Sequence, residues 1–356
     1  MAYVVELVGP RVISIRDEVT SPPGSSEVAV RTLYSGISAG TELASYRGTN
    51  PYLEKRWDPG YALFVPGEST FHYPMDAWGY SEVGRVEAVG EGVSAPQVGD
   101  VVWGMWCHRS YAVLPAERVV RHRLPPNVDP LVGTFNRVGA VALNAVLASG
   151  ACIGESAVIF GQGVIGLLAT QLLVGQGVEV FAVDTVPFRL DLARRFGAIP
   201  LLSTGGDIAA ELRELTGGSG VDRVLELTGA YPALNAAIRC AGVDGTVVAA
   251  GFYQGPATAL SLGDEFHHNR VTLVASQIGA PPKVLQPRWN RERLHRTVMR
   301  LCADGRLDPK PLVTHVIPAR RAAEAYELLD RSPADVLQVI LDFREDPADT
   351  PGGAST

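Results

Sequence analysis

The chain is short of cysteine, of clustered positive charge and of long apolar runs, and each shortage excludes a class of protein. Its four cysteines lie far apart and form no CxxC pair, which argues against a disulfide framework and against a zinc lobe built from cysteines. The net charge is −7 and no basic block stands out, so nucleic acid is not an expected partner. No apolar run reaches the roughly 18 residues of a membrane-spanning helix. No basic-then-apolar leader follows Met1, so a cytoplasmic location away from membranes is expected.

What is present points to two domains in an α/β chain. The 356 residues are 46% hydrophobic, enough for two hydrophobic cores. The first 34 residues and residues 79–121 alternate apolar and polar positions between Gly and Pro breaks, which predicts a β-rich, barrel-like part. Residues 49–78 show little periodicity and are expected to form a long surface loop. From residue 154 to about 279, six short apolar segments alternate with helical patterns, which predicts a doubly wound parallel sheet of six strands. The expected strands are 156–160, 178–183, 198–202, 221–226, 246–251 and 271–276.

A glycine motif follows the first of these strands. The apolar run 157–160 leads into Gly161-Gln-Gly163-Val164-Ile165-Gly166 and then into a helical segment. The first glycine permits a sharp turn, the second lets a pyrophosphate approach the backbone, and the third lets helix and strand pack closely. Strand, GxGxxG and helix in this order predict a dinucleotide whose phosphates meet the N-terminus of the helix.

An acidic residue ends the second expected strand. Asp184 lies roughly 20 residues beyond the glycine turn, where a carboxylate meets the adenosine ribose hydroxyls. It would repel a 2′-phosphate, so NAD(H) is favoured over NADP(H). Arg189 is close enough in sequence to face the adenine or a phosphate, which leaves NADP(H) possible. The alternatives are a solvated strand-end residue for Asp184 and a helix-surface charge for Arg189.

The order of these segments resembles the medium-chain dehydrogenase/reductase superfamily over about residues 1–343. The resemblance is carried by Gly79-x4-Gly84-x-Val-x-x-Val-Gly90, by Val98-Gly-Asp100, by the GxGxxG turn and by a return to the first domain at the end of the chain. It implies a GroES-like catalytic domain and a Rossmann domain, with substrate between them. The implied division is 1–148 for the first part of the catalytic domain, 149–279 for the Rossmann domain, 280–346 for the return segment and 347–356 for a flexible tail.

The sequence departs from the zinc-dependent members of that superfamily at each ligand position. Those members carry Cys in a G-x-C-G-T-[DE] turn, where this chain reads Gly-Ile-Ser38-Ala-Gly-Thr-Glu. They carry His in a G-H-E motif, where Tyr80 stands here, and a Cys or Glu near the position of Asn136. Zinc prefers thiolate, imidazole and carboxylate ligands. We therefore predict no metal and a zinc-independent branch, similar to bacteriochlorophyllide dehydrogenase-like proteins and to dehydrogenases of sugar and secondary metabolism.

Without zinc, another group must stabilise the oxygen whose charge changes during hydride transfer. Thr41 matches the hydroxyl proton-relay position of the family. Tyr80 replaces the metal-binding His, and its phenol, with an ordinary pKa of about 10, is an acid or a hydrogen-bond donor at neutral pH. Asn136 is a third candidate donor. The structural alternatives are a turn-capping hydroxyl for Thr41, a packed barrel residue for Tyr80 and a structural amide for Asn136.

Further binding residues are implied by matching strand ends to the family. The nicotinamide half of the cofactor would be lined by Leu227, Thr228, Ala250, Gly251, Phe252, Ser276 and Gln277. Arg288 and Trp289 follow the last expected strand and could bind an anionic or ring-shaped substrate through a guanidinium and a stacking face. The alternative is the start of a solvated helix with a buried Trp.

Three functions are consistent with these patterns. The leading hypothesis is hydride transfer between NAD(P) and a secondary alcohol or ketone, on a sugar or aminosugar of a biosynthetic pathway. The others are a quinone or enoyl reductase, and a non-catalytic dinucleotide-binding protein. A homo-oligomer, dimer or tetramer, is expected for a family of this kind.

Overall fold

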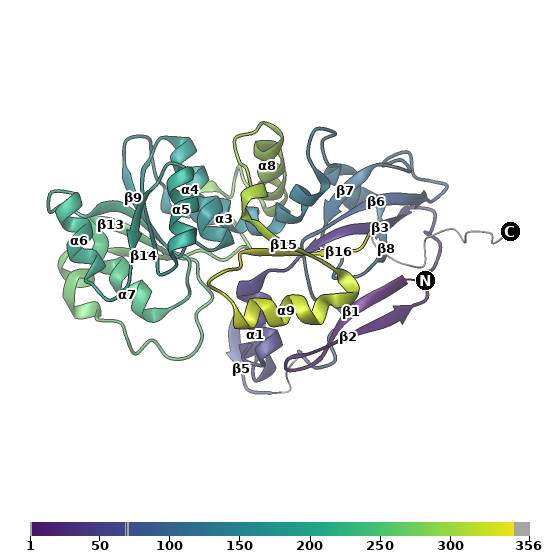
Figure 1. Ribbon diagram of the computed structural model, residues 1–356, viewed down its shortest axis with the longest axis horizontal. Coiled ribbons are helices and arrows are strands. Elements are labelled where there is room, and N and C mark those ends of the chain that lie inside the picture. The colour runs from purple at the N-terminus through teal and green to yellow at the C-terminus, as the bar shows by residue number, and fades with distance from the viewer. Residues whose placement is uncertain (1, 68, 70, 345–356) are drawn as a thin grey trace. The chain divides into compact units, whose positions relative to one another are not determined.

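The computed structural model describes residues 2–67, 69 and 71–344, which group into two compact units. The first unit comprises the described residues up to Asn136 and from Val313 onward, and the second runs from Arg137 to Leu312. Figure 1 labels many of their helices and strands and colours the chain from its N-terminus to its C-terminus. Each unit has its own sheet and its own buried core, and each is described by itself below.

The second unit is built on a six-stranded parallel sheet in the order β11-β10-β9-β12-β13-β14. Its strands are β9 (Ser156–Phe160), β10 (Glu179–Asp184), β11 (Ile199–Leu202), β12 (Val221–Glu226), β13 (Ala241–Ala249) and β14 (Thr272–Ala275). The predicted α/β fold and its doubly wound sheet are confirmed. The strand order reverses between β9 and β12, and ligands of such sheets bind at the carboxyl ends of strands beside this switch point.

Four helices cover the two faces of this sheet. They are α4 (Val164–Gln176), α5 (Pro187–Arg195), α6 (Ile208–Leu215) and α7 (Tyr231–Cys240). Helices α4 and α5 lie together on one side, and α6 and α7 lie together on the other (Figure 1). Because both faces are covered, β9 and β10 are buried almost throughout and read as continuous apolar runs.

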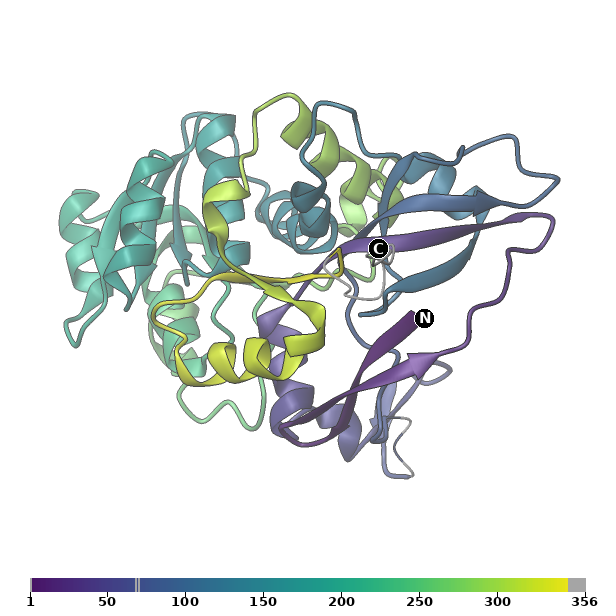
Figure 2. The ribbon, with the colours of Figure 1, turned by 45° about the vertical axis from the view of Figure 1, so that its right-hand side comes forward.

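The first unit is built on a mixed sheet in the order β15-β16-β3-β6-β7, with β8 paired to β3. Its strands are β3 (Glu27–Gly36), β6 (Glu82–Val89), β7 (Val101–Gly104), β8 (Tyr111–Pro115), β15 (Val313–Pro318) and β16 (Gln338–Asp342). Strands β1 (Ala2–Gly9) and β2 (Val12–Glu18) form a separate antiparallel pair, drawn in purple in Figure 2. Helices α1 (Ala39–Arg47) and α9 (Ala322–Arg331) contact each other in this unit, which also contains the short α2 (Ala116–Val119).

Two segments differ from the sequence-based expectations. The expected loop 49–78 contains a short antiparallel pair, β4 (Arg56–Asp58) with β5 (Leu63–Val65). The expected turn 35–42 is the end of β3 followed by the first turn of α1, so Thr41 and Glu42 are helical. Residues 137–148 and 280–312 lie in the second unit, which includes most of α3 (Asn136–Ser149) and all of α8 (Arg291–Ala303). The division into a catalytic and a Rossmann domain stays a prediction.

Helices α3 and α8 approach each other closely at one point. A Cβ at Gly139 of α3 would lie 2.5 Å from Cγ1 of Val298 in α8. The segment Pro130–Ser149 is also long and apolar enough to be tested as a membrane span, but 72% of its apolar window is buried in the protein. This burial is typical of a core helix, so the segment is only weak evidence for a span.

Two glycines of α4 give a matched test of the packing around the glycine turn. A Cβ at Gly166 would lie 1.8 Å from the carbonyl oxygen of Gly161, whereas nothing lies within 4 Å of one at Gly175. We expect Gly166→Ala to destabilise the protein by about 1–3 kcal/mol or more. Gly175→Ala should be neutral or stabilise it by about 0.5–1 kcal/mol. Thermal or denaturant unfolding measures both, and equal stability of the two variants would contradict the close contact.

Candidate active site

The glycine turn between β9 and α4 forms an open cradle at the N-terminus of a helix. Gly161 has φ +89°, and a Cβ there would lie 2.7 Å from the methyl group of Thr228. Gly163 is the N-cap of α4, no side chain caps the helix, and nothing lies within 4 Å of a Cβ built on Gly163. The first amides of a helix have no intrahelical acceptor, and together with the helix dipole they favour an anion. The cradle fits the pyrophosphate of a dinucleotide.

The side chains of Gln162 and Asp184 fix this turn through hydrogen bonds. Gln162 is fully buried, where its Nε2 donates to the carbonyl oxygen of Ile159 (3.1 Å) and its Oε1 accepts from the hydroxyl of Thr170 (2.9 Å). The backbone amide of Gln162 donates to Oδ2 of Asp184 (2.6 Å), and the amide of Val186 donates to Oδ1 (2.9 Å). Each oxygen of Asp184 therefore accepts one backbone N–H and keeps a further lone pair.

Asp184 and Arg189 lie close together. Asp184 ends β10 and is 8% exposed, and the nearest guanidinium nitrogen of Arg189 is 3.8 Å from its Oδ2. The Asp184 carboxylate can accept hydroxyl groups, while Arg189 adds positive charge beside it. Their roles toward a cofactor stay predictions.

The sequence analysis missed a buried carboxylate at the carboxyl end of β12. Glu226 is fully buried, and four donors converge on it. They are the amide (2.8 Å) and hydroxyl of Thr228, the amide of Gly229 (3.2 Å) and the phenol of Tyr253. Burial and the hydrogen bond to Glu226 raise the pKa of Tyr253 above its ordinary value, so the phenol stays protonated. The only sequence signal was a charged residue at the end of an apolar strand.

Two glycines bring the loops after β12 and β13 into contact above Glu226. Gly229 has φ +74°, and a Cβ on Gly251 would lie 2.2 Å from the amide nitrogen of Gly229. Beyond β14, Asn144 of α3 donates to the hydroxyl of Ser276 (3.2 Å) and to the carbonyl of Gln277 (3.4 Å). The residues expected at the nicotinamide half all follow the carboxyl ends of these three strands: Leu227, Thr228, Ala250, Gly251, Phe252, Ser276 and Gln277.

The three expected proton donors all belong to the first unit, but they differ in setting. Tyr80 is half-buried and its phenol donates to the hydroxyl of Ser38 (2.6 Å), the residue before α1. Thr41 is exposed in the first turn of α1. Asn136 is fully buried, and its Nδ2 donates to the carbonyl of Gly133 (2.9 Å) while its Oδ1 has no hydrogen-bond partner within the described chain. The structure therefore joins Tyr80 to Ser38.

The donor set at the positions where zinc-dependent members of the resembled superfamily carry ligands does not fit zinc. Ser38 and Tyr80 supply hydroxyl groups that bond to each other, and Asn136 supplies an amide. None of these is a thiolate, imidazole or carboxylate. Among residues 2–67, 69 and 71–344, no group of three or more His, Cys, Asp or Glu side chains is arranged to hold a metal ion.

Arg288 and Trp289 lie in the second unit, just before α8. Arg288 is exposed and Trp289 is half-buried. The guanidinium of Arg293 lies 4.4 Å from the centre of the Trp289 ring, and its Nη1 donates to the carbonyl oxygen of Arg288 (2.5 Å). One face of the indole is therefore already covered by a cation, and Arg288 is the more accessible candidate for an anionic group.

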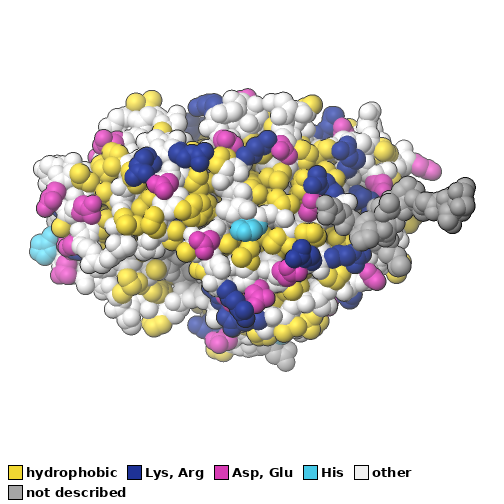
Figure 3. Space-filling view, viewed as in Figure 1, with side chains coloured by type: hydrophobic (Ala, Val, Ile, Leu, Met, Phe, Trp, Pro, Cys, Tyr) yellow, Lys and Arg dark blue, Asp and Glu magenta, His cyan; other side chains and the backbone are white. Residues whose placement is uncertain are grey.

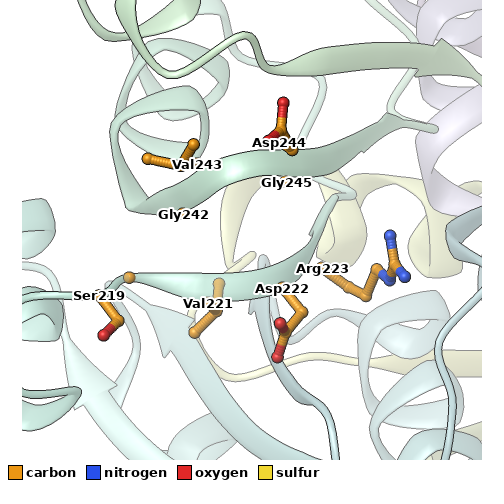
Figure 4. Close-up of a pocket in the computed structure, with 9 residues that line it drawn as sticks. Ser219, Val221, Asp222, Arg223, Gly242, Val243, Asp244 and Gly245 are labelled. Atoms are coloured by element: carbon orange, nitrogen blue, oxygen red, sulfur yellow. The ribbon is translucent and has the colours of Figure 1, made fainter.

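A separate hollow of about 440 Å³ lies at the opposite edge of the same sheet (Figure 4). It is lined by the amino ends of β12 and β13, away from the glycine turn. Its charged side chains already have partners, because Arg223 bonds to Glu155 (2.8 Å), Asp244 bonds to Arg270 (2.6 Å), and Asp222 accepts from the amide (2.8 Å) and hydroxyl (2.9 Å) of Ser156. We therefore assign no ligand to it.

The sequence is similar to those of several known dehydrogenases. The model of a family described as zinc-binding dehydrogenase matches residues 164–291. The D-guloside 3-dehydrogenase of Escherichia coli (strain K12) is 27% identical over 342 residues, which cover 94% of this chain and 98% of that protein. The 2-desacetyl-2-hydroxyethyl bacteriochlorophyllide A dehydrogenase of Cereibacter sphaeroides is 27% identical over 348 residues, covering 96% and 98%.

Solved structures show the same fold. The 2R,3R-butanediol dehydrogenase of Bacillus subtilis superposes with a TM-score of 0.76 at 24% identity, covering 96% of this chain and 99% of that one. An Escherichia coli CFT073 alcohol dehydrogenase complexed with NADH gives 0.77 at 20% identity, with the same coverage. A Sinorhizobium meliloti 1021 structure bound to NADP gives 0.77 at 19% identity, again covering 96% and 99%.

The mismatch at the zinc positions gives a direct prediction. Protein purified without chelator should contain far less than one zinc per chain, because hydroxyl and amide oxygens are poor ligands for this ion. Inductively coupled plasma mass spectrometry measures the metal content, and a zinc-dependent dehydrogenase treated in parallel is the control. A stoichiometric zinc that survives dialysis would contradict the prediction.

Proposed function

The matches support membership of the medium-chain dehydrogenase/reductase superfamily, and on that premise we propose that this chain is a zinc-independent, NAD(H)-preferring oxidoreductase of a secondary alcohol or ketone. The observation that carries the proposal is the uncapped N-terminus of α4 behind Gly163. An anion-binding helix end beside the switch point of a parallel sheet suits a dinucleotide pyrophosphate.

The residues of the second unit would hold the cofactor as follows. The amides of Gly163, Val164, Ile165 and Gly166 would bind the pyrophosphate, and Asp184 would accept hydrogen bonds from the ribose hydroxyls. Asp184 favours NAD(H), while Arg189, 3.8 Å from it, makes NADP(H) possible as a weaker cofactor. When bound, the nicotinamide supplies or accepts a hydride.

Residues of the first unit would donate the proton that the substrate oxygen takes up during reduction. Reduction of a carbonyl places negative charge on its oxygen, and a positioned donor stabilises that charge. Tyr80 is the best candidate, because its phenol is half-buried and already in a hydrogen bond with Ser38. If Tyr80 turns and gives its proton to the substrate oxygen, a phenolate remains, and the hydroxyl of Ser38 can donate a hydrogen bond to it. Thr41 is a second donor at the surface of α1, and Asn136 is the least accessible of the three.

The substrate proposed is a sugar or another polyhydroxylated ring in a biosynthetic or secondary-metabolic pathway. Support comes from the names of the relatives, one of which is a guloside dehydrogenase. The exposed guanidinium of Arg288 could bind an anionic group on the substrate. The hairpin of β4 and β5 exposes Trp57 and Tyr61, aromatic side chains of the kind that stack on sugar rings.

We also propose a cytoplasmic homo-oligomer, a dimer or a tetramer. β14 is an edge strand with half-exposed Leu273, and edge strands of this kind are usually covered. Acidic and basic side chains are interspersed on the face shown in Figure 3. Nucleic acid and membranes are not proposed as partners.

A substrate screen tests the proposed function. Oxidation of NADH and NADPH is followed at 340 nm against sugar ketones, quinones and enones, with and without a chelator. We expect a sugar ketone to be reduced, faster with NADH, at a rate that the chelator does not change. Reduction of an enone with its carbonyl intact would instead indicate an enoyl reductase, and NADH binding without turnover would indicate a non-catalytic protein.

Two substitutions test the proton donors. Tyr80→Phe should lower kcat at least about tenfold, because it removes the donor from the reacting oxygen. Thr41→Ala should lower it if the hydroxyl relays the proton onward. Tyr111→Phe, which removes a phenol that bonds only weakly to the carbonyl of Ser21 (3.4 Å), is the control. Unchanged kcat in both Tyr80→Phe and Thr41→Ala would show that another group donates the proton to the substrate oxygen.

A further inference from the structure

Five polar side chains of the first unit form one hydrogen-bonded cluster that the proposed chemistry does not use. Each is at most 3% exposed, and they come from β3, α1, β6, the segment before β8, and α9. The members are Ser35, Glu42, Glu82, His108 and Tyr326. Two buried carboxylates around one imidazole are costly unless their charges and hydrogen bonds are matched.

His108 lies at the centre of this cluster. Its Nδ1 is 2.7 Å from the hydroxyl of Ser35, and its Nε2 is 3.0 Å from both Oε2 of Glu42 and the phenol oxygen of Tyr326. The hydroxyl of Ser35 donates to Oε1 of Glu82 (2.9 Å), and the phenol of Tyr326 donates to Oε2 of Glu42. Both ring nitrogens therefore face oxygen atoms.

The hydrogen bonds fix the protonation of the ring. A hydroxyl has a single hydrogen, and Ser35 and Tyr326 give theirs to the carboxylates of Glu82 and Glu42. In this arrangement their oxygens accept from His108, which requires a proton on Nδ1 and on Nε2. Burial raises the pKa of the Glu82 carboxyl, and a protonated Glu82 that donates to Ser35 would be the competing arrangement with a neutral ring. Burial lowers the pKa of His108, but the charges of Glu42 and Glu82 and the hydrogen bond to Glu42 outweigh it and raise the pKa overall.

The cluster also sets the backbone that carries Tyr80. Gly79 has φ +86°, and a Cβ there would lie 2.6 Å from the His108 ring, so the chain crosses directly over the imidazole. Trp78 stands edge-on to His108 (5.5 Å) and stacks on Tyr326 (4.7 Å). On the other side, Oε1 of Glu42 accepts from the amide of Ser38 (2.9 Å).

We propose that His108, held as an imidazolium between Glu42 and Glu82, is the positioning residue that fixes the Ser38–Tyr80 pair. The ring supports Tyr80 through Gly79, and it orients Ser38 through Glu42. Without the imidazolium, Glu42 would be a buried carboxylate with no cation and would lose its fixed orientation. The catalytic consequence rests on the proposed role of Tyr80, whereas the protonation of His108 does not.

The first test measures the ring itself. In protein labelled with ¹⁵N-histidine, the signals of His108, assigned by their loss in His108→Gln, should report two protonated nitrogens at pH 7. This measurement needs neither substrate nor cofactor, so it stands even if the chain is not a dehydrogenase. A signal pair typical of a neutral ring with one N–H would overturn the proposal.

The second test separates positioning from stability. His108→Gln and Glu42→Gln should lower kcat about 10- to 100-fold with little change in KM, because a donor shifted by about 1 Å costs rate rather than affinity. His122→Gln, a His of the same unit that stacks on Trp103, should leave both constants unchanged. Wild-type kcat in folded His108→Gln and Glu42→Gln would overturn the positioning role while leaving the proposed function intact.

If a variant is too unstable for an activity assay, its stability to unfolding can still be measured as a function of pH. The titratable groups facing His108 are Glu42, Glu82 and Tyr326, and neighbouring Cys107 has a pKa raised to about 11 by burial. Because the folded pKa of His108 is raised, its stabilisation is complete below about pH 6.5 and is lost as pH rises through the folded value. Wild type should therefore exceed Glu42→Gln in stability most at about pH 5.5–6.5, above the ordinary titration range of carboxyl groups. A difference that does not shrink with rising pH would contradict the imidazolium.

Discussion

A carboxylate can be buried only where donors surround it, and this constraint shapes both units of the protein. An unpaired buried charge costs several kcal/mol. Asp184, Glu226, Glu42 and Glu82 are each at most 8% exposed, and each accepts at least two hydrogen bonds. Many of the donors are backbone amides of the loops that carry candidate site residues. The carboxylates therefore fix loop backbones as well as contributing charge.

In the second unit this constraint acts together with glycine. Gly166 can approach the carbonyl of Gly161 only because it lacks a Cβ, and Asp184 then receives the amide of the intervening Gln162. Glu226 likewise accepts a backbone amide, that of Gly229 in the loop after β12, and Gly251 in the loop after β13 lies directly against Gly229. The helix N-terminus and the strand ends are therefore held in place before any ligand binds, which lowers the entropic cost of binding.

The parts of this architecture that were predictable are those encoded locally. Apolar runs bounded by glycine identified the strands of the parallel sheet, and the GxGxxG spacing identified the turn before α4. The start of α1 was missed because Ser-Ala-Gly-Thr has weak helix propensity, and its amide at Ser38 is capped from Glu42, four residues on. The cluster around His108 was invisible for a different reason. Its members span Ser35 to Tyr326, and only the folded chain brings them together.

The cluster around His108 shows how a site of this fold can be organised when the residues at the zinc-ligand positions are hydroxyl and amide groups. A metal ion cross-links side chains from distant segments and carries net positive charge into the site. The cluster around His108 also cross-links β3, α1, β6 and α9, but its single imidazolium lies between two carboxylates. It can therefore order the neighbouring hydroxyl groups without adding net positive charge. Polarisation of a substrate oxygen would then fall to directional hydrogen bonds, for which the placement of a donor such as Tyr80 matters more than local charge.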